Sequence, residues 1–371
     1  MHSATNGKPR LCVVGPLVGR NPGYVTTQGE ILAAHFAAAG YDVTATSGAT
    51  NRYARLLEIV ATLIRSRRLI DTVLLQVYGG RSFVVEDLAS ALALRCGHRV
   101  VMHLRGGAMP TFMARFPRWT RRVLSRADAI VAPSPFLART MARHGWRASV
   151  IPNVIRVSDY AFRRRAPANP RLFWMRSFHS IYNPLMAVRV LARLRSVLPE
   201  ATLVMGGQDK GLEAIVRAEA VRLGVQSAVR FVGFLDATGK EREGAAADIF
   251  ISTNRIDNAP VAVIEAWAMG LPVVSTDVGG LRDFVRDGET GLLVPDDDTE
   301  AMSAAIARLV QDPALASRLS VHGRREAERC AWPQVHPQWE RLFLQLAAGP
   351  SPERASDVRL QVRRQSKGFG A

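Results

Sequence analysis

Two carboxylates stand eight positions apart in RIDNAPVAVIEAWAMGLPVVSTDVGG, residues 255–280. Asp257 precedes Pro260, and Glu265 lies within the apolar run that follows. Proline suits the first position of a helix, because the N–H that it lacks would have no partner there. The pattern predicts a helix over 260–269 that is closed by a glycine and followed by a buried parallel strand. The free N–H groups at the start of such a helix attract phosphate.

A second candidate is the glycine-rich loop GPLVGRNPGYVTTQGE, which carries Gly15, Gly19 and Gly23. An NAD-binding loop needs the spacing G-x-G-x-x-G and an acidic residue after the second strand. Here the glycines are four apart and the second strand ends in TATSGA, so NAD is disfavoured. The P-loop sequence G-x-x-x-x-G-K-[ST] does not occur either. These glycines either form a turn alone or contact a substrate.

Metal binding and glycoside hydrolysis are weaker interpretations of the acidic residues. The run Asp296-Asp297-Asp298 precedes a helix start, which is typical of an N-cap in a solvated loop. A glycosidase needs two acids flanking the bond, but Glu265 lies on a helix whose start suits phosphate. The cysteines lack metal-ligand spacing and are expected to be reduced packing residues of a cytosolic protein; they are Cys12, Cys96 and Cys330.

Alternating strands and helices must position these residues. Such alternation indicates parallel sheets with helices on both faces, and it lapses once near residue 160. We expect two tandem Rossmann-like doubly wound α/β domains over 1–160 and 161–331, with ligands beyond the carboxyl ends of the strands. An amphipathic helix over 332–348 follows, and the polar, basic residues 349–371 are expected to be disordered.

The net charge of +17 indicates an anionic partner, although a GC-rich genome also raises the arginine content. Residues 1–160 hold 21 Lys and Arg against 8 Asp and Glu. The segment 112–127 mixes basic and apolar residues, so it either contacts an anionic membrane or packs its apolar side on the core. Its candidate acceptor and membrane residues are Arg115, Arg118, Trp119, Arg121 and Arg122.

Nucleic acid is not an expected partner, because no recognition motif accompanies the charge. We identify no signal peptide, and no apolar stretch approaches the ~20 residues that span a bilayer. We therefore expect a cytoplasmic protein, with peripheral contact at the inner face of the plasma membrane as the alternative.

The segment DNAPVAVIEAWAMGLPVVSTDVGG resembles the signature of glycosyltransferase family four, retaining enzymes with the two-domain GT-B fold. The family has two glutamates separated by seven residues, then a run A-x-A-x-G-x-P-V-V and a glycine pair. Asp257 stands at the place of the first glutamate, and Glu265 matches the second. The resemblance covers roughly 10–345 and includes the flanking pieces SVIPNVI, LFWMRSFHSIYNPLMAVRVLARL and DGETGLLVPDDD.

The resemblance implies a retaining, metal-independent glycosyltransferase. It would move a hexose from a nucleotide-diphosphate sugar to a glycan, a polysaccharide precursor or a lipid-linked acceptor, with no further cofactor. The donor would bind mainly to the second domain and the acceptor to the first, and the last helix would cross back to the first domain. The alternatives are a GT-B sugar-nucleotide epimerase or hydrolase, and a non-catalytic nucleotide-sugar-binding protein.

The resemblance also assigns roles to single residues. Glu265 would bind the ribose hydroxyls, and Asp257 would face the donor sugar. Arg176 matches the phosphate-binding arginine, and a guanidinium suits that task. His103 matches a histidine that points into the cleft, although a structural role in the loop is the alternative. Further donor contacts would come from the N–H groups near Asn258, Ala259 and Val261.

The chain departs from the family pattern in two places. The family has a lysine shortly after the arginine, where this chain has SFHSIYNP with Tyr182. Lys210, in the loop after the next strand, is our candidate replacement. The change from Glu to Asp at 257 shortens the side chain by ~1.5 Å. It therefore changes which hydroxyls of the donor sugar the pocket can contact.

Overall fold

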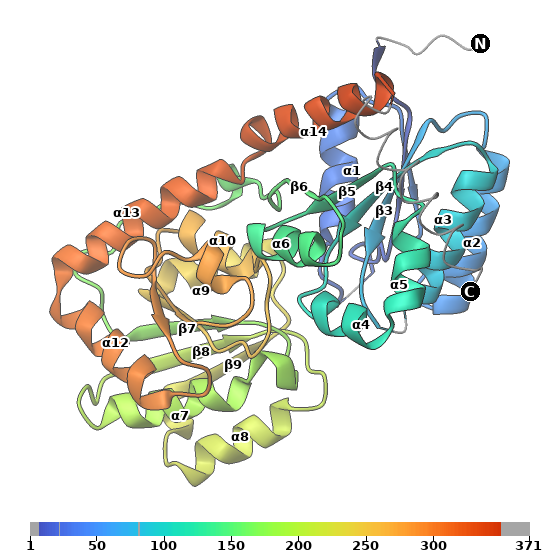
Figure 1. The fold of residues 1–371 in the computed structure, drawn as a ribbon. Coiled ribbons are helices and arrows are strands. Elements are labelled where there is room, and N and C mark those ends of the chain that lie inside the picture. Colours follow the sequence, from blue (N-terminus) through green and yellow to red (C-terminus); the bar gives the residue numbers. More distant parts are fainter. Residues whose placement is uncertain (1–6, 22, 81, 350–371) are drawn as a thin grey trace, which may run out of the picture.

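The computed structural model describes residues 7–21, 23–80 and 82–349, which form two α/β domains joined side by side (Figure 1). The first domain contains a six-stranded sheet in the order β2-β1-β3-β4-β5-β6, and its recorded pairings are parallel. The strands are β1 (Leu11–Val14), β2 (Val43–Thr46), β3 (Thr72–Val77), β4 (Arg99–Leu104), β5 (Ala129–Ala132) and β6 (Ser149–Val150). The helices are α1 (Gln28–Ala38), α2 (Arg52–Arg65), α3 (Phe83–Arg95), α4 (Met109–Arg115), α5 (Pro117–Leu124) and α6 (Pro135–Arg143).

The second domain repeats this plan with the order β12-β11-β10-β7-β8-β9, again parallel. Its strands are β7 (Arg171–Met175), β8 (Thr202–Gly206), β9 (Val229–Gly233), β10 (Ile249–Ser252), β11 (Val273–Thr276) and β12 (Leu292–Val294). The helices are α7 (Pro184–Arg195), α8 (Glu213–Arg222), α9 (Ala237–Ala246), α10 (Val261–Ala268), α11 (Leu281–Phe284), α12 (Thr299–Gln311), α13 (Pro313–Arg329) and α14 (Trp332–Ala347). Short 3₁₀ turns cover Val157–Asp159, Ser180–Tyr182 and Gln226–Ala228. The predicted pair of doubly wound domains is confirmed.

Both faces of the first sheet are covered, as β1 shows, where all four residues are apolar and buried. Leu11 and Val13 belong to a cluster with α1 and α14, whereas Cys12 and Val14 belong to a cluster with α2, α3 and α5. Successive side chains of a strand point to opposite faces, so this alternation assigns each β1 residue to one helix layer. Cys12 is thus a packing residue, as predicted.

Helix α14 follows α13 of the second domain but packs on the first (Figure 1). Trp339 is buried there, with its ring 5.7 Å from that of Phe36 on α1. The predicted crossing helix is therefore confirmed. The chain passes from β6 to β7 between Val150 and Arg171, and the predicted boundary at residue 160 lies inside this connection. The predicted disordered tail falls, except for Gly349, outside the described residues.

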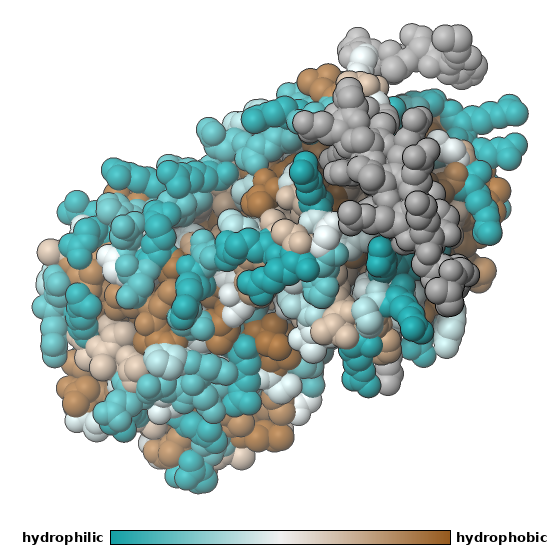
Figure 2. Space-filling view, in the orientation of Figure 1, coloured by the Kyte–Doolittle hydropathy of each residue, from teal (hydrophilic) through white to brown (hydrophobic). Residues whose placement is uncertain are grey.

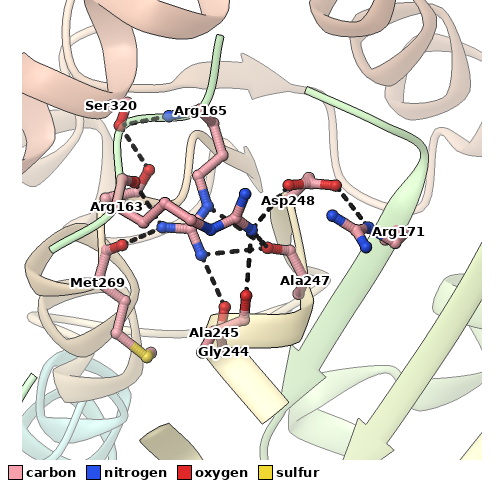
Figure 3. A network of polar contacts seen from close by, with 10 residues as sticks. Arg163, Arg165, Arg171, Gly244, Ala245, Ala247, Asp248, Met269 and Ser320 are labelled. Carbon is pink, nitrogen blue, oxygen red and sulfur yellow. Dashed lines mark hydrogen bonds and ion pairs between the residues drawn. The ribbon is translucent and has the colours of Figure 1, made fainter. Parts of the chain in front are cut away.

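A buried arginine fixes this connection to the second domain (Figure 3). Arg165 is fully buried, and its guanidinium donates to the carbonyls of Gly244 at 2.8 Å and Ala247 at 3.1 Å, and also to that of Met269. Burial lowers the pKa of Arg165 to about 9, which leaves it charged at neutral pH. Asp248 beside it accepts from the neighbouring arginines Arg163 and Arg171.

No helix within the described ranges is long and apolar enough to cross a membrane.

Candidate active site

A cavity of about 780 Å³ lies between the two domains. Its first-domain wall comes from the loop after β1, residues 19–21 and 23–28, together with Arg105 and Asn153. The second-domain wall comes from the loops after β7, β8 and β9 and from the start of α10. These segments follow the carboxyl ends of parallel strands, where α/β sheets bind ligands. The cleft that we expected between the domains is present.

Glu265 stands at the second-domain wall as the acceptor of two hydrogen bonds. Its Oε1 accepts from the Tyr160 hydroxyl at 2.9 Å and from Lys240 Nζ on α9 at 2.8 Å. Burial and the Glu265 carboxylate raise the pKa of Tyr160 above its ordinary value, so Tyr160 keeps its proton and donates. Within the described residues nothing binds Oε2, which leaves this oxygen to a ligand in the cavity.

Asp257 and Arg176 form an ion pair across the same wall. Arg176 Nη2 lies 2.7 Å from Asp257 Oδ2, which also accepts from Asn254 at 2.6 Å. The Arg176 guanidinium stacks 5.2 Å from the centre of the Tyr182 ring. Tyr182 thus supports the arginine and does not itself stand in for a cation. Arg176, Asp257 and Tyr182 line the cavity. The N–H groups of Arg176 that do not bind Asp257 are therefore available to an anion.

The start of α10 completes this wall. Pro260 is the N-cap and not the first helical residue as predicted, and the helix begins at Val261. Among the described residues, the N–H groups of Val261 and Ala262 have no hydrogen bond, and both residues line the cavity. Gly279 shows why a glycine pair follows the strand: it has φ +57°, and a Cβ there would lie 2.2 Å from the Asp257 carbonyl.

His103 does not face the cavity, so the prediction of a cleft-facing histidine is wrong. It belongs to the face of β4 that α14 covers, because Val101, two residues earlier, packs in the same cluster as Trp339. The His103 ring lies 5.3 Å from that of Trp339, and the side chain is buried. Burial and the nearby Arg105 hold the pKa of His103 well below its ordinary value. The structural alternative fits this position.

Arg105, two residues further along, reaches the cavity instead. Its Nε donates to Gln76 Oε1 at 2.6 Å, and its Nη1 donates to Asn153 Oδ1. Asn153 in turn donates to the carbonyl of Ala259, directly before the N-cap of α10, at 2.8 Å. Burial lowers the pKa of Arg105 to about 10, so the guanidinium remains charged. A hydrogen-bonded chain thus joins a first-domain cation to the second-domain wall.

Three other predicted donor residues lie outside the cavity. Lys210 is exposed on its loop, and the lysine at the wall is Lys240. Asn258 is buried and bonds across the domain interface to Ser134. Gly15 serves packing, because a Cβ there would lie 2.8 Å from Gln76. The predicted residues that do line the cavity are Gly19, Arg176, Asp257, Ala259, Val261 and Glu265.

The segment 112–127 packs most of its apolar side on the core, whereas Phe116 is 39% exposed. Trp119 stacks on Phe83, with ring centres 5.0 Å apart, and its Nε1 donates to Asp87 at 2.7 Å. Arg122 also pairs with Asp87, whereas Arg115 lies over the Phe116 ring. Arg118 and Arg121 are exposed.

Glu86, beneath the cavity-lining Tyr78, gives a pH-dependent prediction. Its Oε1 accepts from the Tyr78 N–H at 3.1 Å, and burial raises its pKa from 4.5 to about 8. Between these two pH values, Glu86 therefore holds a proton in the folded protein that it has lost in the unfolded chain. This contribution to stability is full below pH 4.5 and is lost as the pH rises through about 8. We expect Glu86→Gln to raise the free energy of unfolding at alkaline pH by about 3 kcal/mol and to leave it unchanged near pH 5.

Melting curves of both proteins between about pH 5 and pH 9 measure this difference, with Glu58→Gln on the exposed side of α2 as the control. Wild-type and Glu86→Gln curves that stay parallel over the range would show that Glu86 is ionised in the folded protein.

Residues 169–312, which form most of the second domain, match the family described as Glycosyl transferases group 1. The chain is 31% identical over 209 residues to the lipopolysaccharide core biosynthesis glycosyltransferase LpsE of Rhizobium meliloti, covering 53% of this chain and 58% of that protein. It is 28% identical over 240 residues to the phosphatidyl-myo-inositol mannosyltransferase of Mycobacterium leprae, covering 63% of this chain and 62% of that protein. The chain thus matches about six tenths of the length of these curated relatives.

Solved structures agree in fold. HepE of Anabaena, in complex with UDP and glucose, superposes with a TM-score of 0.75 at 16% identity and covers 91% of this chain and all of its own. Sucrose-phosphate synthase of Thermosynechococcus elongatus gives 0.76 at 18% identity and covers 92% of this chain and all of its own. The second domain is thus similar in sequence to the group 1 glycosyl transferases, and the chain has the two-domain α/β GT-B fold of these solved structures.

Proposed function

We propose that this protein is a glycosyltransferase that moves a hexose from a nucleotide-diphosphate sugar to a glycan, a polysaccharide precursor or a lipid-linked acceptor. One observation carries the proposal: the free oxygen of Glu265, the guanidinium of Arg176 and the free N–H groups at the start of α10 meet on one wall of the interdomain cavity. A hydroxyl acceptor, a cation and amide donors are what a ribose and a diphosphate require.

Each group has a task in this reaction. Glu265 Oε2 accepts hydrogen bonds from the ribose hydroxyls, while Lys240 and Tyr160 hold the carboxylate in place. Arg176 and the N–H groups of α10 stabilise the charge that develops on the departing diphosphate. Asp257 orients Arg176 and faces the donor sugar.

Arg105 adds positive charge from the first-domain wall, opposite Arg176. With cations on both sides of the leaving group, we propose transfer that needs no metal ion. The family resemblance supports retention of configuration, with the acceptor attacking on the face that the diphosphate leaves. The acceptor would enter along the loop after β1, which includes Gly19 and Tyr24. The names of the relatives, a lipopolysaccharide core enzyme and a phosphatidylinositol enzyme, support a glycan or lipid-linked acceptor and peripheral contact with an anionic membrane.

Thermal-shift measurements with UDP-, GDP-, ADP- and dTDP-sugars test the donor site. A ligand that binds only the folded state must raise the melting temperature by mass action. We expect one nucleotide class to stabilise the wild type and to lose most of its effect on Glu265→Gln. The glutamine side chain keeps the shape of the glutamate but not its negative charge. Glu300→Gln, at a largely exposed site on α12, is the matched control.

The results separate the candidate functions. A nucleotide sugar that shifts neither protein at millimolar concentration would refute the donor site. Binding without consumption of the donor would support the non-catalytic alternative, and release of free hexose without any acceptor would support a hydrolase. The anomeric proton of the product, observed by NMR, tests retention, and activity in excess EDTA tests metal independence.

A further inference from the structure

Arg105 differs from most of the cations that line the cavity, because within the described residues it forms hydrogen bonds only with uncharged side chains. Arg20 in the same lining is exposed to solvent. A carboxylate cancels most of the charge that its partner presents to a ligand, so Arg105 supplies the uncompensated positive charge in the enclosed part of the cavity. The cations that do pair with a carboxylate are Arg176 with Asp257, Lys240 with Glu265, and Arg156 with Asp159.

Three buried side chains of the first domain hold the Arg105 guanidinium. Gln76 Oε1 on β3 accepts from its Nε at 2.6 Å, and Asn153 Oδ1 accepts from its Nη1. His103 Nδ1 on β4 lies 3.2 Å from its Nη2. Because a guanidinium can only donate, His103 accepts through Nδ1 and carries its proton on Nε2. Gln76, His103 and Asn153 are 2%, 1% and 6% exposed, and we call these three residues the neutral cradle.

The neutral cradle favours the position of Arg105 over the stability of the first domain. In the part of the chain that the structure describes, Gln76 Nε2 and His103 Nε2 are buried donors without a hydrogen-bond partner. Such groups destabilise a folded protein. Both side chains therefore direct their acceptor atom to Arg105 and leave their donor unbonded, which is the arrangement expected of residues that serve a site.

Asn153 also connects Arg105 to the wall of the second domain. Its Nδ2 donates at 2.8 Å to the carbonyl of Ala259, which directly precedes the N-cap of α10. The N–H groups of Val261 and Ala262, which have no hydrogen bond among the described residues, begin that helix and line the same cavity as Arg105. A cation of the first domain and amide donors of the second thus face one space, in which an anion can contact both.

The other charges of the protein contribute less to this space. Figure 2 shows hydrophilic side chains over much of the face that it presents. Water and salt screen charges at such a surface, whereas an enclosed charge is screened far less. The net charge of +17 therefore says little about the cavity, where the potential depends on single side chains such as Arg105.

We propose that the neutral cradle holds Arg105 in place without cancelling its charge, so that the whole charge meets the diphosphate of the donor. Gln76, His103 and Asn153 are positioning residues that act through the guanidinium. A carboxylate in the cradle would keep a hydrogen bond to the guanidinium but would cancel its charge. The inference deepens the proposed function and rests on it, because the anion that it names is the donor diphosphate.

Gln76→Glu tests this role with a minimal change. Because Gln76 Nε2 has no partner within the described ranges, the substitution removes no hydrogen bond there and adds only a negative charge. The probes are UDP, GDP, ADP and dTDP, titrated by calorimetry. We expect Gln76→Glu to bind the diphosphate that the wild type prefers at least about tenfold more weakly, and its kcat/KM to fall at least as much. Gln226→Glu, at an exposed site of the second domain, is the matched control and should behave as the wild type.

Gln76→Met separates the charge from the hydrogen bond. Methionine has a similar length but no acceptor for Arg105 Nε, so the guanidinium stays charged and is held less firmly. We expect Gln76→Met to bind the diphosphate more tightly than Gln76→Glu does. The opposite order would show that Gln76 has a purely structural role and would overturn the proposal. Asn153→Asp repeats the charge test on the other side of the guanidinium, should Gln76→Glu not fold.

The melting temperature without ligand gives an independent readout. Gln76→Glu should melt no lower than the wild type, because its carboxylate pairs with an enclosed cation that had none. A clearly lower melting temperature of folded Gln76→Glu would contradict the absence of a counter-charge at Arg105 and would overturn the proposal.

The binding results also identify the source of the anion. Diphosphate binding by Gln76→Glu as tight as that of Gln226→Glu would overturn the proposal, and a raised KM for the acceptor in that case would place the anion on the acceptor. Both results leave the donor site intact. A wild type that binds none of the four nucleoside diphosphates would instead refute the donor site, and this inference with it.

Discussion

Arg176→Ala is expected to lower kcat/KM for glycosyl transfer by roughly 10²–10³-fold, because it removes a preorganised cation from the leaving diphosphate. Arg176 is held for this task by Asp257 at 2.7 Å and by the Tyr182 ring, so its position does not depend on the ligand. Initial rates with the donor identified by thermal shift measure the effect. Most of the loss should appear in kcat, since the charge on the diphosphate increases toward the transition state.

Two variants make this result specific. Arg176→Lys keeps a positive charge but not the planar fork, so we expect an intermediate rate. Arg189→Ala on α7 removes an arginine that pairs with Glu219 far from the cavity wall, and it should leave the rate unchanged. If Arg176→Ala retained activity within about threefold of wild type, another group would have to stabilise the diphosphate, and Arg105 and Lys240 would be the next candidates.

Arg165→Leu is expected to destabilise the protein by about 3–5 kcal/mol. The guanidinium donates to the buried carbonyls of Gly244, Ala247 and Met269, and leucine would remove these hydrogen bonds. Arg163 would remain as a donor to the carbonyls of Ala247 and Met269, but not to that of Gly244. At ~2–4 °C per kcal/mol, the melting temperature of the second domain should fall by roughly 10 °C. Scanning calorimetry measures this change.

Arg325→Leu is the matched control, because Arg325 is exposed on α13 and its substitution removes the same charge. A melting temperature of Arg165→Leu close to that of Arg325→Leu would mean that water or a rearranged loop replaces the guanidinium. Catalytic constants of any folded Arg165→Leu protein should be unchanged, because Arg165 lies outside the cavity lining.

The elements and part of the site could be predicted because they depend on local pattern. Alternating apolar runs specified two parallel sheets, and the segment from Asp257 to Glu265 was correctly predicted as a loop and a helix, with both carboxylates lining the cavity. Within this segment the structure differs from the prediction at Pro260, which is the N-cap, and at Asn258, whose side chain bonds to Ser134 of the other domain. Where the contacts are local, the sequence was sufficient to predict the structure.

The failures concern contacts between distant parts of the chain. His103 and Arg105 both stand at the end of β4, and only the position of Trp339 on α14 decides that the first is covered and the second reaches the cavity. Lys240 comes from α9 and meets Glu265 because two helices of one domain converge. No motif marks such a lysine, and the sequence pattern points to Lys210 instead, because Lys210 follows the expected strand. Strand-end side chains can be assigned only when the covering elements are known.

The crossing of α14 also determines the order in which the protein can be made. The first domain contains residues of the first half of the chain, but Val335, Trp339, Leu342 and Phe343 complete one side of its core. A ribosome therefore releases the whole second domain before the first can close its core around Phe36. Until then that apolar face lacks the cover of α14. Synthesis of this protein thus finishes the first domain last.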